Sequence, residues 1–329
     1  MILVTGGAGY IGSHCVLELI KNKYDVLIFD NLSTGHAETV ETLKKYGNVR
    51  FIQGDLQNIY DIKKVFANNE IDAVLHFAAF SLVGESVKNP RKYYMNNVYG
   101  TLNLLNTMLD YNVKKIVFSS TAATYGEPKY VPIDEKHPQE PINPYGQTKL
   151  MLEKIMDDYD KAYGLKSVRL RYFNVAGADE QCRIGEWHEP ESHLIPNILK
   201  STFSDGKTFK MFGEDYDTKD GTCVRDYIDM ADLTNAHLLA FKYLENGGET
   251  NFFNLGTKEG SSVKEVFAAC EKITGKKIPI EICPRRAGDP ATLVADNTKA
   301  KNILGWYPNY NLEDSITHAY NWEKKLNHV

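Results

Sequence analysis

The feature that most constrains the fold of this chain is a glycine-rich turn near its N-terminus. Residues 1–5 (MILVT) form an apolar segment typical of a buried strand, and the turn GGAGYIG at residues 6–12 follows at once. A helical pattern continues to Leu19, and a second apolar segment at residues 24–29 ends at Asp30. Strand, glycine turn, helix, strand and acid, in this order, are the pattern of a dinucleotide-binding βαβ unit.

The turn and the acid together predict which dinucleotide is bound. Gly6, Gly9 and Gly12 follow a GxxGxxG spacing, which allows a tight turn and a close approach of the backbone to a pyrophosphate. The N–H groups at the start of the following helix would then face the phosphates. Asp30 lies 18 residues after Gly12 and can accept hydrogen bonds from an adenosine ribose, whereas its charge would repel a 2′-phosphate. We therefore expect NAD rather than NADP; the alternative is a glycine turn without a ligand.

Further alternation of strands and helices predicts an α/β fold with a Rossmann-type, doubly wound parallel sheet. Apolar segments at 49–54, 72–77 and 115–119 are typical of buried strands. In such sheets the ligand lies beyond the carboxyl ends of the strands, so the loop at 77–81 should face the glycine turn. Asp55 is then a candidate for the adenine edge, while His76 is interpreted as a packed strand residue.

Tyr145 and Lys149 lie four residues apart at the start of an apolar, helix-periodic segment. On a helix they share one face, and a positive charge beside a phenol lowers its pKa and makes it a usable base near neutral pH. The same spacing also occurs on ordinary solvated helix faces. Thr121, in a run of hydroxyl residues after the strand at 115–119, could bond a substrate oxygen beside the tyrosine or simply belong to a polar turn.

Charge and composition argue against several other classes of function. The 329 residues carry a net charge of −5 without a dense Lys/Arg block, which does not favour nucleic-acid binding. No apolar run approaches the ~18 residues of a membrane span, and the chain starts directly in the first strand without a leader pattern. Five cysteines without a CxxC pair indicate a reducing, cytoplasmic location rather than disulfides or zinc. The nine histidines show no metal-ligand spacing, so we expect no metal ion.

The pattern changes after residue 174, which predicts two domains. Residues 1–174 would form the NAD-binding domain, and residues 175–329 a smaller mixed α/β substrate domain that covers the cleft. We expect residues 227–255 to pack back on the sheet domain. Residues 175–192 are typical of a loop, and the elements predicted after them are helices over 193–199, 230–244, 262–273 and 312–326 and a strand over 209–212.

Two arginines of the C-terminal part are the expected partners of a substrate diphosphate. Guanidinium forks match phosphate oxygens, which favours Arg225 and Arg286 for this role. The alternative is that they form surface ion pairs with Asp226 and Asp289.

Several sequence blocks along the chain carry a family resemblance. They are VTGGAGYIGSH (4–14), HFAA (76–79), VGES (83–86), NPYGQTK (143–149), RYFN (171–174), Gly221, VRDY (224–227) and PRRAGD (284–289). The chain thereby resembles the extended short-chain dehydrogenase/reductase superfamily and, more narrowly, the UDP-glucose 4-epimerases. The first blocks are shared across the superfamily, whereas the later blocks together are more specific to nucleotide-sugar epimerases.

The resemblance implies reversible inversion at C4 of the hexose in UDP-glucose and UDP-galactose, through a transient 4-keto sugar and with tightly held NAD. It implies Tyr145 as the catalytic base, Lys149 as its pKa partner and ribose contact, and Thr121 as the hydroxyl partner. The residues it places around the cofactor are Gly6, Gly9, Tyr10, Ile11, Gly12, Asp30, Asn31, Asp55, Leu56, Phe77, Ala78, Ala79, Ser81, Asn96, Thr121, Tyr145, Lys149 and Phe173. Those it places around the substrate are Thr121, Tyr145, Asn174, His193, Leu194, Phe212, Arg225, Arg286, Asp289 and Leu293.

Departures from the family pattern help to separate related reactions. Some members have a lysine where Ser81 stands, and many have a serine where Thr121 keeps the hydroxyl. Related nucleotide-sugar 4,6-dehydratases carry an acid one or two places after that hydroxyl, to move the proton at C5 or C6. Ala122 and Ala123 occupy these places here and can move no proton, so elimination is disfavoured.

Other functions remain open from the sequence. They are another UDP-sugar 4-epimerase (for UDP-glucuronate or UDP-xylose), an NAD-dependent nucleotide-sugar oxidoreductase, and an NAD-sensing scaffold, against which the intact base argues. Leu293 aligns with the position that limits space beside the sugar C2 group, and a leucine there predicts that UDP-N-acetylglucosamine is also accepted. The family usually pairs through two helices, here 91–111 and 147–163, so a homodimer is expected.

Overall fold

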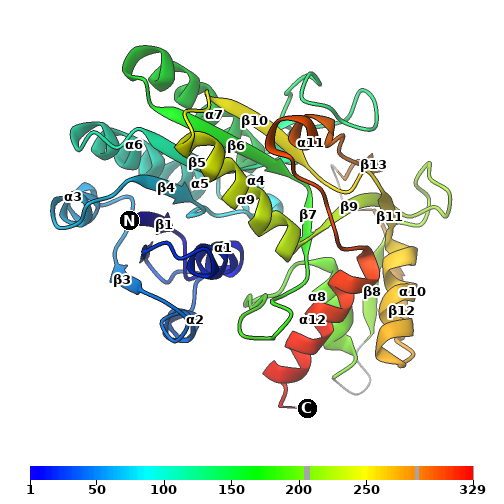
Figure 1. Ribbon diagram of the computed structural model, residues 1–329. Helices are drawn as coiled ribbons and strands as arrows, with labels where there is room; N and C mark the ends of the chain where they lie inside the picture. The colour runs from blue at the N-terminus through cyan, green and yellow to red at the C-terminus, as the bar shows by residue number, and fades with distance from the viewer. Residues whose placement is uncertain (204–207, 286–288, 329) are drawn as a thin grey trace.

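The computed structural model describes residues 1–203, 208–285 and 289–328 and is built around a seven-stranded sheet (Figure 1). The strands lie in the order β10-β6-β5-β4-β1-β2-β3, and every neighbouring pair is parallel. The order of the chain reverses at β1, which confirms the predicted Rossmann-type, doubly wound sheet. The strands are β1 (Ile2–Thr5), β2 (Val26–Asp30), β3 (Val49–Gln53), β4 (Ala73–His76), β5 (Lys115–Thr121), β6 (Lys166–Tyr172) and β10 (Asn251–Leu255).

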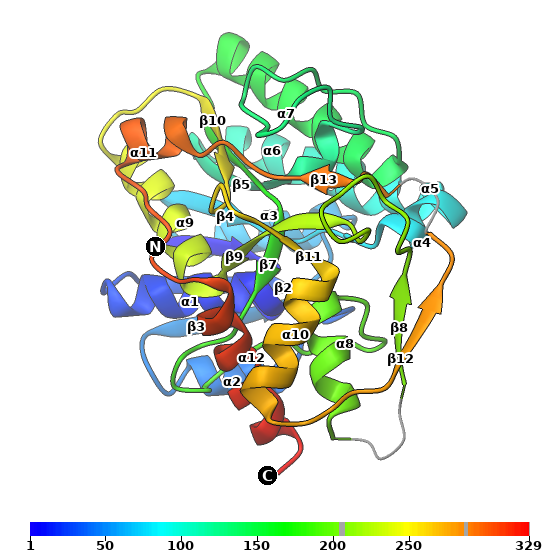
Figure 2. The ribbon, with the colours of Figure 1, turned by 90° about the vertical axis from the view of Figure 1, so that its right-hand side faces the viewer.

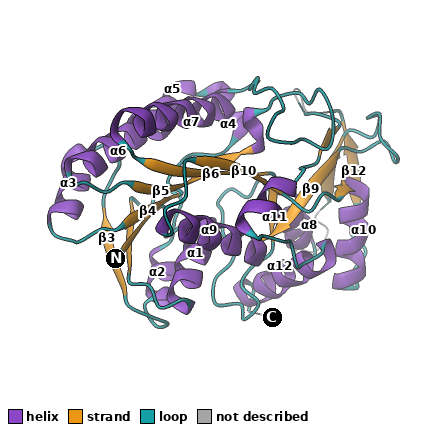
Figure 3. Ribbon diagram, turned by 45° about the horizontal axis from the view of Figure 1, so that its top comes forward, coloured by secondary structure: helices purple, strands orange, loops and turns teal. Residues whose placement is uncertain are grey.

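Helices cover both faces of this sheet, as Figure 3 shows. Helices α1, α2 and α9 share one hydrophobic core with the sheet, and α3, α6 and α7 share another on the opposite face. Because both faces are covered, the central strands β1, β2 and β4 are buried along their whole length. These helices are α1 (Tyr10–Lys21), α2 (Ala37–Leu43), α3 (Ile59–Ala67), α6 (Gly100–Asp110), α7 (Pro144–Tyr163) and α9 (Met230–Glu245).

A π-helical segment, η1 (Tyr94–Tyr99), precedes α6 and follows the short helices α4 (Val83–Lys88) and α5 (Pro90–Tyr93). Such segments are rare and occur frequently at functional sites. In η1 the side chain of Asn97 accepts a hydrogen bond from the backbone N–H of Phe80 (2.9 Å) and donates to the Phe80 carbonyl oxygen (3.0 Å) and to Oγ1 of Thr148 (3.2 Å). The loop after β4 is therefore fixed against α7 at the carboxyl edge of the sheet.

In the described C-terminal part, two small sheets lie beside the helices α8, α10 and α12 (Figure 2). Strand β7 begins two residues after β6 and pairs with β9, so the chain passes from the large sheet to a small sheet at Asn174. A second small sheet consists of β8 and β12. The elements are β7 (Asn174–Ala176), α8 (Leu194–Ser201), β8 (Phe209–Phe212), β9 (Val224–Asp229), β11 (Gly260–Ser262), α10 (Val263–Thr274), β12 (Ile280–Cys283), β13 (Thr292–Leu293) and α12 (Leu312–Leu326).

The helices and the strand predicted for this part are confirmed, but β9 was not predicted. The predicted helices correspond to α8, α9, α10 and α12, and the predicted strand is β8. The sequence of β9 (VRDYID) is charged, yet every residue after the first is buried. Asp226 is tolerated there because its carboxylate accepts backbone N–H groups of Thr257, Lys258 and Ala295.

Three elements of the described C-terminal part return to the large sheet. Helix α9 packs against α1, β10 pairs with β6, and α11 (Thr298–Leu304) lies against both α9 and β10 (Figure 1). The division into two domains at residue 174 stays a proposal, and these contacts support the expected packing of residues 227–255 on the sheet domain.

Candidate active site

A cleft of about 420 Å³ lies at the carboxyl ends of the strands, lined both by the large sheet and by the C-terminal part. Every residue that the sequence placed around the cofactor lines this cleft. Five of the residues placed around the substrate line it as well, in addition to the shared Thr121 and Tyr145: Asn174, His193, Leu194, Asp289 and Leu293. The structure thus brings the predicted residues together, while their individual roles stay predictions.

The glycine turn forms a cradle that side chains would fill. Gly6 has a φ of +74°, and a Cβ there would lie 2.6 Å from the backbone nitrogen of Ala78. A Cβ on Gly12 would lie 2.2 Å from the Gly6 carbonyl oxygen. Helix α1 begins after Gly9 without a side-chain cap, so its first N–H groups have no capping acceptor. A backbone this close to a row of free N–H groups fits a pyrophosphate.

Two acids follow β2 and β3 at the edge of the cleft. The Asp30 carboxylate accepts hydrogen bonds from the backbone N–H groups of Ala8 (3.0 Å) and Leu32 (2.8 Å), while burial raises its pKa. The amide of Asn31 donates to Asp55 over 3.0 Å. Both carboxylates are therefore held by the turns that present them and line the same cleft as the glycine turn, while their contact with an adenosine stays a prediction.

The start of α7 brings Tyr145 to the end of β5. Asn143 caps this helix by accepting the N–H of Gly146 over 2.8 Å. A Cβ on Gly146 would lie 2.4 Å from the Ala123 carbonyl oxygen, so the helix can approach the strand closely only with glycine there. The Tyr145 phenol consequently hydrogen-bonds the hydroxyl of Thr121. The two side chains predicted as the base and its hydroxyl partner thus lie together, while their roles stay predictions.

The predicted effect of Lys149 on the phenol is wrong for this arrangement. Burial raises the pKa of Tyr145 to about 12, and the hydrogen bond of Thr121 lowers it only in part. The ammonium of Lys149 instead donates to the Ser119 carbonyl oxygen over 2.7 Å. Burial lowers the pKa of Lys149 to about 7, against the opposing charge of Glu153. Desolvation of both groups therefore outweighs their proximity on one helix face.

A buried ionic network behind Lys149 was missed in the sequence. Glu153, one turn further along α7, accepts the Nε of Arg171 over 2.9 Å and the hydroxyl of Ser120 over 2.5 Å. Arg171 also donates to the Tyr125 hydroxyl over 2.9 Å. Burial raises the pKa of Glu153, but the bonds and charge of Arg171 outweigh this and hold it below its usual value. The i, i+4 spacing from Lys149 to Glu153 was the available signal.

His76 is a packed strand residue, as predicted. It is 1 % exposed, with Nδ1 2.6 Å from Oγ1 of Thr5 and Nε2 2.8 Å from Oγ1 of Thr101. Burial lowers its pKa to about 3, so it stays neutral.

The residues expected to hold the substrate diphosphate and base are only partly brought to the cleft. Arg225 lies in β9, between β11 and β13, and is 8 % exposed. It forms the alternative ion pair, with Nη2 3.3 Å from Oδ1 of Asp289, and does not itself line the cleft. Phe212 lies at the end of β8 and is not among the lining residues either. Arg286 lies outside the described residues.

The loop between β7 and α8 is tied to the glycine-turn region. The hydroxyl of Tyr10 donates to the Gly177 carbonyl oxygen over 2.5 Å. The ring of His36 stacks on that of Trp187 with 3.9 Å between centroids, and its Nε2 lies 3.0 Å from the Trp187 carbonyl oxygen. These contacts hold residues 177–187 beside the first turn of α1.

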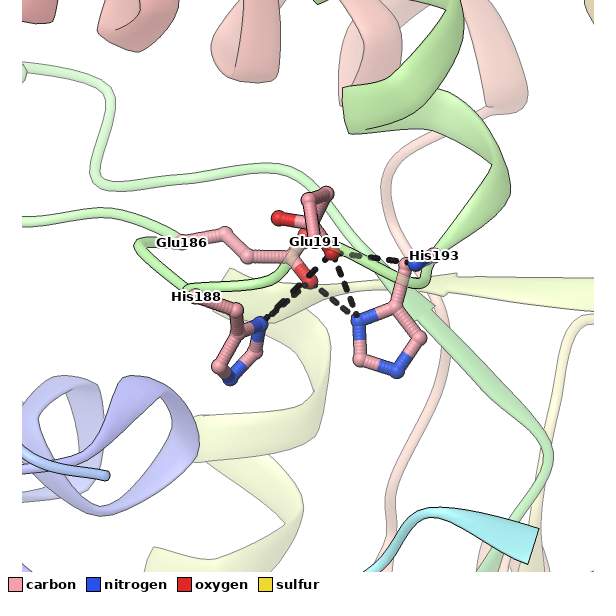
Figure 4. A group of neighbouring side chains, drawn as sticks. All are labelled: Glu186, His188, Glu191 and His193. Atoms are coloured by element: carbon pink, nitrogen blue, oxygen red, sulfur yellow. Dashed lines mark hydrogen bonds and ion pairs between the residues drawn. The ribbon is translucent and has the colours of Figure 1, made fainter. Parts of the chain in front are cut away.

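Four side chains at the end of this loop form a compact cluster, which Figure 4 shows. They are Glu186, His188, Glu191 and His193, and we call them the loop cluster. Both histidines line the cleft. Burial lowers the pKa of His188, but the two carboxylates outweigh the effect of burial and raise the pKa to about 9. Of these four residues only His193 was predicted from the sequence, although the pattern ExHxxExH at residues 186–193 was an available signal.

The GDP-mannose 4,6 dehydratase family matches residues 3–319 of the chain. A UDP-glucose 4-epimerase of Halalkalibacterium halodurans is 53% identical over 328 residues, covering 99% of this chain and 96% of the relative.

Solved structures of such epimerases are also similar to this chain. The UDP-glucose 4-epimerase of Bifidobacterium longum, in complex with NAD+ and UDP, is 42% identical with a TM-score of 0.94 and covers 98% of both chains. The UDP-Glc/GlcNAc 4-epimerase of Campylobacter jejuni is 44% identical with a TM-score of 0.86, and the match covers 98% of this chain and 99% of that one.

Proposed function

The chain belongs to the UDP-glucose 4-epimerases within this family, and on that premise we propose that it interconverts UDP-glucose and UDP-galactose by reversible inversion at C4, with NAD bound. The observation that carries the proposal is that the hydrogen-bonded pair Tyr145–Thr121, the glycine turn, Asp289 and Leu293 all line one cleft.

The residues that would hold NAD are those of the glycine turn, with Asp30 and Asp55 at the adenosine and Lys149 and Phe173 at the other end. NAD, when bound, supplies the hydride acceptor for C4 and a positive charge beside the phenol. The first turn of α1 provides N–H donors for the pyrophosphate, and this supports binding without the lysine that some members have in place of Ser81.

Tyr145, as the phenolate, takes the proton of the 4′-hydroxyl, and as the phenol it gives the proton back after the 4-keto sugar has presented its other face. Thr121 holds the sugar oxygen beside the phenol through its hydroxyl, which already bonds Tyr145. Lys149 is buried, and the bond of its ammonium to Ser119 holds its side chain in place within the site. Proton transfer by a positioned base of this kind contributes roughly 10²–10⁴-fold to a rate.

The protein holds the substrate mainly through its UDP part. Asp289, whose ion-pair partner is Arg225, would bind the uridine ribose, and the cleft-lining residues Asn174, His193 and Leu194 would contact the diphosphate and sugar. A dehydratase is not supported, because Ala122 and Ala123 line the cleft next to Thr121 in the short 3₁₀ segment η2 (Ala122–Thr124) and carry no acid.

The decisive test is incubation of the purified protein with UDP-galactose and no added reductant. We expect UDP-glucose to form without net NADH, because the hydride is returned in each cycle. Accumulation of NADH in proportion to substrate would refute epimerisation and favour an oxidoreductase. The absence of any turnover, in protein that still binds NAD and UDP, would favour the scaffold function.

The acceptance of acetylated sugars is a further part of the proposal. Leu293 lines the cleft and packs against the small core of Ala122, Tyr125 and Ile133. A tyrosine there would extend into the cleft, so we expect wild type to turn over UDP-N-acetylglucosamine and Leu293→Tyr to lose this activity while it keeps UDP-glucose. Equal, negligible use of the acetylated sugar by both proteins would contradict the idea.

We also propose a homodimer and a cytoplasmic location. Met95, Tyr99 and Tyr163, on the two segments expected at the interface, are 42%, 42% and 55% exposed, which supports pairing there; sedimentation would test it. All five cysteines are free, which suits a reducing compartment. In the described part of the chain, no helix is both long and apolar enough to span a bilayer.

A further inference from the structure

The loop cluster has no assigned part in the proposed reaction beyond the contact of His193 with the substrate region. Its two carboxylates are nearly buried: the side chains of Glu186 and Glu191 are 4% and 5% exposed. The backbone N–H groups of Ser192 and His193 donate to Oε1 of Glu191 over 2.8 and 2.9 Å, which fixes that carboxylate. The cluster is therefore preorganised by the turn that carries it.

The four side chains point their ligand atoms at one centre (Figure 4). Nδ1 of His188 lies 3.2 Å from Oε1 of Glu186 and 3.8 Å from Oε1 of Glu191. Nδ1 of His193 lies 3.6 Å from Oε1 of Glu191 and in close contact with Oε1 of Glu186. One ligand atom from each residue falls within 4.8 Å of all the others. A tetrahedral ion with bonds of roughly 2.0–2.1 Å places its ligand atoms about 3.3 Å apart, close to these spacings.

One of these atoms has only an imperfect protein partner. Nδ1 of His188 is buried and lies 3.2 Å from Oε1 of Glu186, but this contact does not have the geometry of a hydrogen bond. A buried nitrogen is better satisfied if something else occupies the centre it faces. A metal ion would use its lone pair directly.

The charges around the loop cluster also favour the binding of a cation. Glu323 of α12 is 3% exposed and lies near the ammonium of Lys200, which also pairs with Glu191 over 3.4 Å. Two largely buried carboxyl groups thus share this lysine, while among the described residues the Glu186 carboxylate has only the two histidines as partners. The charge of Glu186 is balanced either by protons on the two imidazoles or by one divalent ion.

We propose that Glu186, His188, Glu191 and His193 bind a divalent transition-metal ion of the zinc class. Two imidazole nitrogens and two carboxylate oxygens form a ligand set that suits Zn²⁺ in tetrahedral geometry, and four protein ligands characterise a structural rather than a catalytic ion. The ion would join residues 186–191 of the loop to the start of α8 and so fix the wall of the cleft. This inference does not depend on the proposed reaction.

The sequence expectation of no metal ion is revised by this proposal. His188 and His193 are separated by four residues, which is within the range of common zinc spacings, but no cysteine pair accompanies them, and the site depends on how the loop folds around two glutamates.

The test is metal binding by the full-length, chelator-treated protein. We expect one equivalent of Zn²⁺ to bind in competition with a chromophoric chelator and to raise the Tm. Co²⁺ should give the visible absorption of a tetrahedral site without a thiolate charge-transfer band, which excludes the five cysteines as ligands. His188→Ala and His193→Ala should each weaken Zn²⁺ binding by at least roughly 100-fold, because loss of a residue that only hydrogen-bonds a ligand can already cost that much.

The exposed His328 offers a matched control, and His328→Ala should bind Zn²⁺ as wild type does. The Tm of each metal-free variant shows whether it is folded. Wild type that binds no Zn²⁺ at one equivalent would overturn the proposal and leave the cluster as protonated ion pairs. So would wild-type affinity in His188→Ala, or a thiolate band with Co²⁺.

Discussion

The buried ammonium of Lys149 should make the protein less stable at neutral than at alkaline pH. Lys149 is 3% exposed and donates to one carbonyl oxygen, and burial lowers its pKa from 10.5 to about 7. In the unfolded chain the same group holds its proton up to about pH 10.4. Between these values the unfolded state binds more protons, so stability must rise with pH. The destabilisation is complete below pH 7 and vanishes above the unfolded pKa.

The magnitude follows from the difference between the two pKa values. At 1.36 kcal/mol per pKa unit, the charged lysine costs the folded state roughly 5 kcal/mol when the destabilisation is complete. At pH 7, where the folded group is half protonated, the folded state is destabilised by about 4 kcal/mol. At pH 9 this destabilisation is about 2 kcal/mol. The free energy of unfolding should therefore gain about 2 kcal/mol from this residue alone between pH 7 and pH 9.

The assay is urea unfolding of nucleotide-free wild type and Lys149→Met at both pH values. Methionine removes the titration but keeps an unbranched side chain, and the pH-independent loss of the bond to Ser119 cancels in the double difference. Lys154→Met is the matched control, because Lys154 is exposed on the same helix α7. Its double difference should be close to zero.

A double difference below about 0.5 kcal/mol for Lys149→Met would refute the reasoning, since it would mean that the folded lysine titrates near its ordinary pKa. An equally large effect for Lys154→Met would do so as well, because it would assign the pH dependence to the helix rather than to burial.

Three further predictions concern the site and its support. Tyr145→Phe should lose about 10²–10⁴-fold in kcat with UDP-galactose while UDP still binds, which a calorimetric titration would check; retained kcat would remove the phenol from the reaction. Gly12→Ala should lose bound NAD, because its Cβ would meet the Gly6 carbonyl oxygen at 2.2 Å, and the nucleotide that co-purifies measures this. Arg171→Met should destabilise the fold by about 3–5 kcal/mol by leaving Glu153 unpaired, and a double variant with Glu153→Met should be more stable than the single one; additive losses would contradict a coupled pair.

Local patterns determined much of this protein from the sequence. The glycine turn with Asp30 predicted the first βαβ unit and the carboxyl-edge cleft, and the Tyr145–Lys149 spacing predicted a shared helix face. These inferences succeeded because they depend on neighbouring residues: turn chemistry, burial on both faces of a strand and the period of a helix. Strand β9 escaped them, because its charges are satisfied by distant backbone groups.

What only the tertiary structure decided is the state of the charged groups. It showed that Lys149 bonds Ser119 rather than shifting Tyr145, that Arg171 meets Glu153, and that Arg225 pairs with Asp289 beside the cleft. It also gathered the loop cluster from an irregular segment without periodicity. Spacing along the chain fixes which residues can share an element. The pKa of a group and its partners depend on desolvation and on charges that folding brings from far along the chain.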